Sequence, residues 1–189
     1  SEREQVEEQQ EPKPDKEKAL KDAKGKIAER LTEEAQDTEK AVARITAMVE
    51  KKYTKPNEPT PYMKNKEVGL VPGVYQNGNT TCVPLYNTAG ELRSMAYISE
   101  KGKTSIAKGT EGEAKKCAHF DKKAVEKAAV VTFAVGLANS ATISQAHNDK
   151  NMAMVTAMKD SDLPTLTAAF KQAYPDKQQV IFATNDHAY

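Results

Sequence analysis

The chain has 189 residues, of which 29% are charged and 38% hydrophobic, and its formal net charge is +1. A charge so close to zero excludes the overall basic character of many nucleic-acid binders, so only a local patch can provide such a surface. No stretch approaches the ~18 consecutive apolar residues of a membrane-spanning helix. The acidic N-terminus also lacks the apolar core of a signal peptide. We therefore expect a cytoplasmic protein that does not insert into membranes.

Two cysteines, Cys82 and Cys117, bear on the compartment and on metal binding. They have neither CxxC spacing nor a histidine at a zinc-ligand distance along the chain. In a cytoplasmic protein we expect two ordinary thiols, with a disulfide as the alternative.

The N-terminal part is expected to contain a tail and one long helix. Residues 1–15 are rich in Glu, Gln, Lys and Pro and are predicted to be a disordered tail. Residues 16–54 are predicted to form a long amphipathic helix or linker, because apolar residues recur at spacings of three and four. These are Leu20, Ala23, Ile27, Leu31, Ala35, Thr38, Val42, Ile45 and Val49. The helix either packs on its own domain or forms a partner-binding coiled coil, and three prolines between residues 56 and 61 end it.

Residues 61–121 are predicted to form a β-rich subdomain. Residues 80–86 and 92–98 flank a turn with Gly90, which is typical of a β-hairpin. A second turn at residues 99–103 leads into residues 104–108, giving a small antiparallel meander. Lysines gather here and can track a phosphate backbone, although a solvated charged face is the alternative interpretation. The candidate nucleic-acid-binding residues are Lys101, Lys103, Lys108, Lys115 and Lys116.

Residues 128–189 are predicted to form a parallel sheet. Apolar runs at residues 130–135, 152–157 and 180–183 alternate with helical segments at 139–147 and 163–174. This pattern favours a right-handed βαβαβ unit, in which ligands bind at the carboxyl ends of the strands. The predicted fold class is therefore α/β: a long helix, a small antiparallel subdomain and a parallel sheet. Because the chain stops soon after the third strand, we expect a truncated domain or an end that packs on a partner.

Four stretches carry a resemblance to a known family. Residues 60–66 resemble the motif HPYLxxK, with Thr60 in place of His, and residues 82–92 resemble viPlrdadGel. Residues 102–109 resemble GxKrFlkG, and residues 163–183 resemble NLpavaraLrekyPd followed by ivIaa. In this order, the four stretches resemble the primase-type module of conjugative-plasmid and phage proteins. That module consists of a small β-rich subdomain followed by a Toprim domain, and the resemblance covers about two-thirds of the chain.

The resemblance also implies where a metal would bind. In active Toprim domains, a glutamate after the first strand and a DxD motif after the third strand hold Mg²⁺, which prefers oxygen ligands. Here Val135 stands at the glutamate position, followed by Gly136, and the DxD positions are Thr184, Asn185 and Asp186. Asp186 is the one carboxylate at the three matched positions, so it is the candidate metal ligand. The other four residues mark a degenerate site.

Two further aspartates follow the second predicted strand. Asp160 and Asp162 can in principle substitute as metal ligands. Asp162 is also a candidate helix cap, because Pro164 follows it near the start of a predicted helix.

The resemblance implies a non-catalytic or weakly active domain of a bacterial plasmid DNA-transfer protein, such as a relaxase or primase. We expect no enzymatic activity of its own and no cofactor, except Mg²⁺ if the metal site persists. The expected partners are single-stranded DNA and other domains of the parent protein or the conjugation machinery. Two alternatives stay open: a Mg²⁺-dependent DNA primase with relocated metal ligands, and a coiled-coil partner-binding module.

Overall fold

The computed structural model describes residues 15–182 and divides into two compact units between Asp37 and Thr38. Helix α1, Lys16–Lys51, runs through this boundary and confirms the predicted long N-terminal helix. In the first unit its apolar residues are exposed, including Leu20, Ile27 and Leu31. No helix within residues 15–182 is long and apolar enough to cross a membrane.

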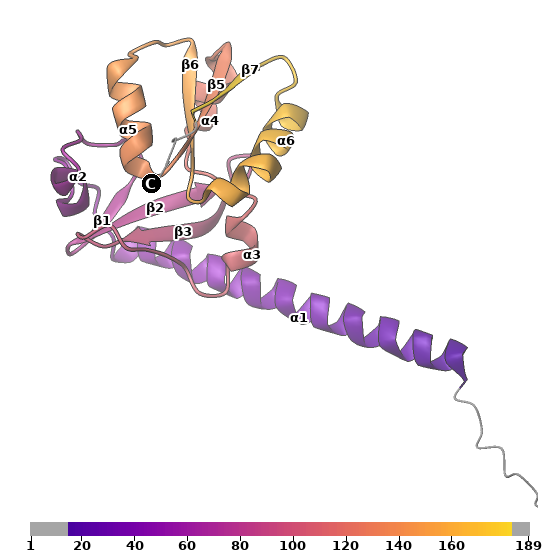
Figure 1. Ribbon diagram of the computed structural model, residues 1–189. Helices are drawn as coiled ribbons and strands as arrows, with labels where there is room; N and C mark the ends of the chain where they lie inside the picture. Colours follow the sequence, from indigo (N-terminus) through magenta and orange to yellow (C-terminus); the bar gives the residue numbers. More distant parts are fainter. Residues whose placement is uncertain (1–14, 183–189) are drawn as a thin grey trace, which may run out of the picture. The chain divides into compact units, whose positions relative to one another are not determined.

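The second unit contains a four-stranded antiparallel sheet in the order β1-β2-β3-β4 (Figure 1). Its strands are β1 Tyr75–Asn77, β2 Thr80–Tyr86, β3 Leu92–Ile98 and β4 Thr104–Ile106. The β2–β3 hairpin turns as predicted: the amide of Asn87 donates to the carbonyl of Glu91 at 3.0 Å, and Gly90 has φ +83°. Glycine adopts this left-handed conformation without the steric cost that other residues carry.

Both faces of the antiparallel sheet are covered. Successive side chains of a strand point to opposite faces, so each strand contributes to a core on either side. On one face, Cys82 and Met95 pack with Ile45 from the C-terminal part of α1. On the other face, Val83 and Leu85 pack with Tyr62 and Met63 of the short helix α2, Pro61–Asn65. Within the second unit, α1 therefore packs on its own domain. Both cysteines are buried free thiols, as expected.

An ion-pair cluster fixes the C-terminal part of α1 on the antiparallel sheet. The guanidinium of Arg93 in β3 lies 2.7 Å from a carboxylate oxygen of Glu39 and 3.3 Å from one of Glu113 in helix α3, Glu111–Ala114. These two carboxylates raise the pKa of Arg93, and the pairing with Arg93 lowers the pKa of Glu39. No sequence pattern pointed to these three residues.

The second sheet is parallel, with the strand order β6-β5-β7, which confirms the predicted βαβαβ unit. Its strands are β5 Val130–Val135, β6 Met152–Ala157 and β7 Gln178–Ile181. Helices α5 Leu137–Ala146 and α6 Leu163–Ala173 lie on opposite sides of the sheet (Figure 1). The core includes a T-shaped contact between Phe133 and Phe170, with ring centroids 5.5 Å apart. β7 is an edge strand and is more exposed than the apolar run predicted.

One segment joins the two sheets. Ala118 exchanges backbone hydrogen bonds with Tyr86 of β2, and His119 exchanges them with Thr156 of β6. Helix α4, Lys122–Lys127, follows directly and packs with the parallel sheet through Val125. The β-rich part and the parallel sheet of the second unit therefore share a continuous network of hydrogen bonds.

Candidate nucleic-acid interface

The carboxyl edge of the parallel sheet is where the fold favours a binding site. β5 ends at Val135, and Gly136 turns the chain into α5 with φ +85° and ψ 144°, a conformation essentially restricted to glycine. The amide of Gly136 donates to the carbonyl of Ala157 at 2.8 Å, and the side-chain amide of Asn139 donates to the carbonyl of Val135 at 2.9 Å. The structure therefore places Val135 and Gly136 at the edge of the sheet.

The chain after β6 brings two carboxylates to the same edge. Asp160–Asp162 forms a single 3₁₀ turn, and Asp162 is 9% exposed. Burial raises the pKa of Asp162, and the nearby ammonium groups of Lys159 and Lys115 lower it in part. Asp162 occupies the N-cap position of α6 as predicted, but its side chain makes no capping hydrogen bond.

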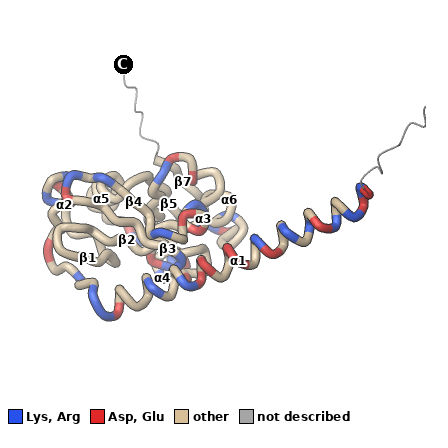
Figure 2. The backbone as a smooth tube through the Cα atoms, turned by 90° about the horizontal axis from the view of Figure 1, so that it is seen from below, with Lys and Arg blue, Asp and Glu red and all other residues tan. Residues whose placement is uncertain are grey.

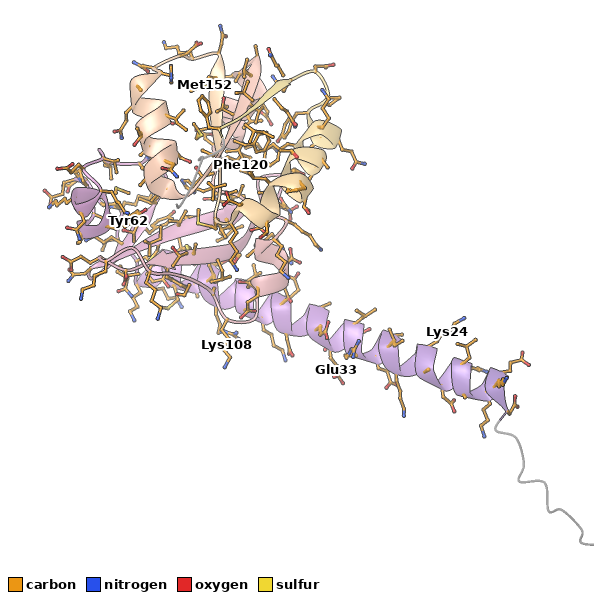
Figure 3. All side chains as sticks on the ribbon, viewed as in Figure 1. Lys24, Glu33, Tyr62, Lys108, Phe120 and Met152 are labelled. Carbon is orange, nitrogen blue, oxygen red and sulfur yellow. The ribbon has the colours of Figure 1, made fainter. Side chains whose placement is uncertain are left out.

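Helix α2 packs against the segment that follows β5. Thr60 caps this helix by accepting a hydrogen bond from the amide of Met63 at 3.4 Å, and its hydroxyl lies 2.6 Å from that of Thr81. The ring of Tyr62, labelled in Figure 3, is buried. Burial raises the pKa of Tyr62, and the backbone amide of Ala138 lowers it in part. Residues 60–66 therefore lie beside the start of α5.

The turn between β3 and β4 lies against α2. A Cβ atom added at Gly102 would stand 3.5 Å from Cε2 of Tyr62 and 3.9 Å from Cε of Lys66. The side-chain amide of Asn65 also donates to the carbonyl of Glu100 at 2.9 Å. Three segments that are far apart in the sequence, residues 60–66, the Gly102 turn and residues 135–140, thus lie next to one another at the carboxyl edge.

Five exposed lysines lie beside the Gly102 turn or near Asp162 and are called the edge lysines. They are Lys66, Lys101, Lys103, Lys115 and Lys159. The basic residues around α2 are visible in Figure 2. Of the other candidate lysines, Lys116 is exposed next to Lys115, whereas Lys108 precedes Gly109, which contacts Ala41 on the α1 side of the antiparallel sheet (Figure 3). The structure therefore divides the predicted set and adds two lysines to it.

The described residues at the edge do not fit a Mg²⁺ site. Val135 offers no side-chain oxygen, Asp162 is buried near the ammonium groups of Lys159 and Lys115, and Asp160 directly follows Lys159. Within residues 15–182, no group of three or more His, Cys, Asp or Glu side chains is arranged to hold a metal ion. Thr184, Asn185 and Asp186 lie outside the described residues.

A cavity of about 570 Å³ lies between α5, β6 and the start of α4. Its lining includes Tyr86, His119, Phe120, Ser140, Met152 and Thr156, two of which are labelled in Figure 3. The buried ring of His119 lies between two of its walls: Nδ1 is 2.9 Å from the carbonyl of Pro84, and Nε2 is 3.1 Å from that of Pro72. Sequence reasoning missed His119, because its partners are backbone carbonyls that leave no motif.

The chain is similar in sequence to two known proteins that share one name. No model of a protein family matches the chain. The chain is similar to two Escherichia coli proteins called DNA primase TraC, with 30% identity over 176 residues and 27% over 178 residues. Each alignment covers 91% of this chain. The chain spans 16% of the length of the first relative and 12% of the length of the second.

One solved structure also resembles the chain. It contains bacteriophage T7 lagging-strand DNA polymerase with primase domains bound to an RNA/DNA hybrid and dTTP. The TM-score is 0.45 at 11% identity, and the match covers 67% of this chain and 62% of that chain.

Proposed function

We propose that this chain is a Toprim/primase-like domain of a plasmid DNA-transfer protein, and that it contacts single-stranded DNA through the edge lysines. The domain is non-catalytic or weakly active. One observation carries the proposal: residues 60–66, the Gly102 turn and the segment after β5 meet at the carboxyl edge of the parallel sheet. The first two belong to stretches that resemble primase motifs, and the third stands where the resembled module has its metal-binding glutamate. The similarity to DNA primase TraC over 91% of the chain supports the same interpretation.

The chemistry of the edge favours binding over catalysis. Exposed ammonium groups can neutralise backbone phosphates and release counterions, which gives affinity without sequence readout. Val135 stands where the resembled motif has a metal-binding glutamate. A valine side chain has no oxygen to hold Mg²⁺, so it cannot position phosphate oxygens through a bound metal ion.

A matched pair of variants tests the DNA contact. We expect Lys101→Gln/Lys103→Gln/Lys115→Gln to weaken binding of a fluorescently labelled single-stranded oligonucleotide, because three positive charges leave the edge. The control Lys123→Gln/Lys127→Gln/Lys150→Gln removes the same charge from exposed positions elsewhere and should keep most of the affinity. Anisotropy titrations measure both. Equal losses in the two variants would show that only net charge matters and would remove the edge as the site.

A further inference from the structure

The first unit presents an apolar helix face to solvent. Leu20, Ile27 and Leu31 are 56%, 50% and 56% exposed. Their spacing of seven and four residues places them on one side of α1. A helix of this kind gains most of its stability from packing that face against another surface.

The charges along the same stretch are segregated. Residues 16–26 contain five lysines, Glu17 and Asp22, which gives a net charge of +3. Residues 27–37 contain four acidic residues and Arg30, which gives a net charge of −3. Figure 2 shows the basic and acidic halves along α1, and Figure 3 labels one residue of each, Lys24 and Glu33.

This segregation does not help the helix itself. Several like charges fall three or four residues apart, where they repel each other, and some opposite charges, such as Asp22 and Lys26, share this spacing. The basic series is Lys18, Lys21 and Lys24, and the acidic series is Glu29, Glu33 and Asp37. Among residues 15–37 the structure has one ion pair, between Arg30 and Glu34 at 3.7 Å, and both side chains are largely exposed. The pattern therefore suits a partner outside the helix.

We propose that a second copy of this chain covers the face, in an antiparallel pair of α1 helices centred near Ile27. Reversing one helix places each +3 half opposite a −3 half, whereas a parallel pair would place like charges together. Ile27 lies at the boundary between the halves, so it packs against its counterpart at the centre of the pair. Leu20 and Leu31 then extend the apolar seam on either side. This pairing is independent of the proposed DNA contact.

Charge-swapped variants of the full chain test the pairing. Lys18→Glu/Lys21→Glu/Lys24→Glu changes the first half from +3 to −3, and Glu29→Lys/Glu33→Lys/Asp37→Lys changes the second half from −3 to +3. Light scattering after size exclusion, over a concentration series, should show a dimer for the unmodified chain and a monomer for each variant. An equimolar mixture of the two variants should restore the dimer. A monomeric unmodified chain, or a mixture that stays monomeric, would overturn the proposal.

Disulfide cross-linking tests the orientation. Under mild oxidation, Ile27→Cys should form a covalent dimer, because the two residues face each other at the centre. In Leu20→Cys each cysteine lies seven residues from that centre, so the pair is about 21 Å apart along the axis. A disulfide needs Cα atoms within roughly 7 Å, so this variant should stay monomeric on a non-reducing gel. Cys82 and Cys117 are buried and do not compete. Efficient cross-linking of Leu20→Cys would overturn the antiparallel arrangement.

Discussion

At the residue scale, the backbone at Gly136 has a conformation that favours a residue without a side chain. Its φ of +85° and ψ of 144° strain any other residue, although an added Cβ would have space, with Asn139 Nδ2 at 3.9 Å. We expect Gly136→Ala to lower the free energy of unfolding by about 1–3 kcal/mol, as measured by chemical denaturation. The control Gly112→Ala lies in α3 with open space around it and should stabilise the fold by about 0.5–1 kcal/mol. Equal effects at both positions would contradict the strain argument.

His119 gives the second prediction at this scale. Burial lowers its pKa, and the carbonyls of Pro84 and Pro72 oppose this in part. Because the unfolded chain then binds more protons than the folded one, the stability from this residue is full above the unfolded pKa of about 6.5. It is lost as the pH falls from there towards the lowered folded pKa.

The pH dependence of stability checks the assignment to His119. Denaturation between pH 5 and pH 8 should show the unmodified chain losing stability below about pH 6.5. In His119→Gln the carboxamide still donates a hydrogen bond but does not titrate, so the slope in this window should flatten. Identical slopes for the two proteins would assign the pH dependence to other groups.

At the element scale, α1 changes character along its length. Ile45 is 4% exposed and packs with Cys82 and Met95, whereas Ile27 is 50% exposed. We expect Ile45→Ala to lower the free energy of unfolding by about 2–5 kcal/mol, because it leaves a cavity in the core. Ile27→Ala should change the stability of the dilute protein by less than about 0.5 kcal/mol. A comparable loss for Ile27→Ala would mean that the exposed stripe also packs within the monomer.

Elements with strong local patterns were predictable from the sequence. The apolar runs of β5 and β6, the hairpin at Gly90 and the start of α6 at Asp162 follow from hydrophobic pattern and turn chemistry alone. The short helices α3 and α4 were not predicted, because four to six residues carry too little periodicity. For β7, the run at residues 180–183 indicated the strand, but Gln178 and Gln179 also join the parallel ladder through backbone hydrogen bonds that need no apolar side chain.

At the scale of the second unit, the site depended on contacts that the sequence could not reveal. The lysines looked like one group along the chain, but tertiary packing places Lys66 beside the Gly102 turn and Lys115 near Asp162, and leaves Lys108 on the α1 side. The pairing of His119 with Thr156, which joins the two sheets, uses only backbone groups. Motif order indicated candidate stretches, and the fold determined which of them meet.

The most direct test of the proposed function is the salt dependence of single-stranded DNA binding, measured in EDTA and in Mg²⁺ at matched ionic strength. We predict that log K falls linearly with log salt, by about 0.7 for each phosphate contacted, with no requirement for Mg²⁺. Asp186→Asn should bind equally well. If the chain shows no salt-sensitive binding, the DNA contact is wrong. If binding needs Mg²⁺ and is lost in Asp186→Asn, the domain retains a metal site, and the metal-dependent primase becomes the better account.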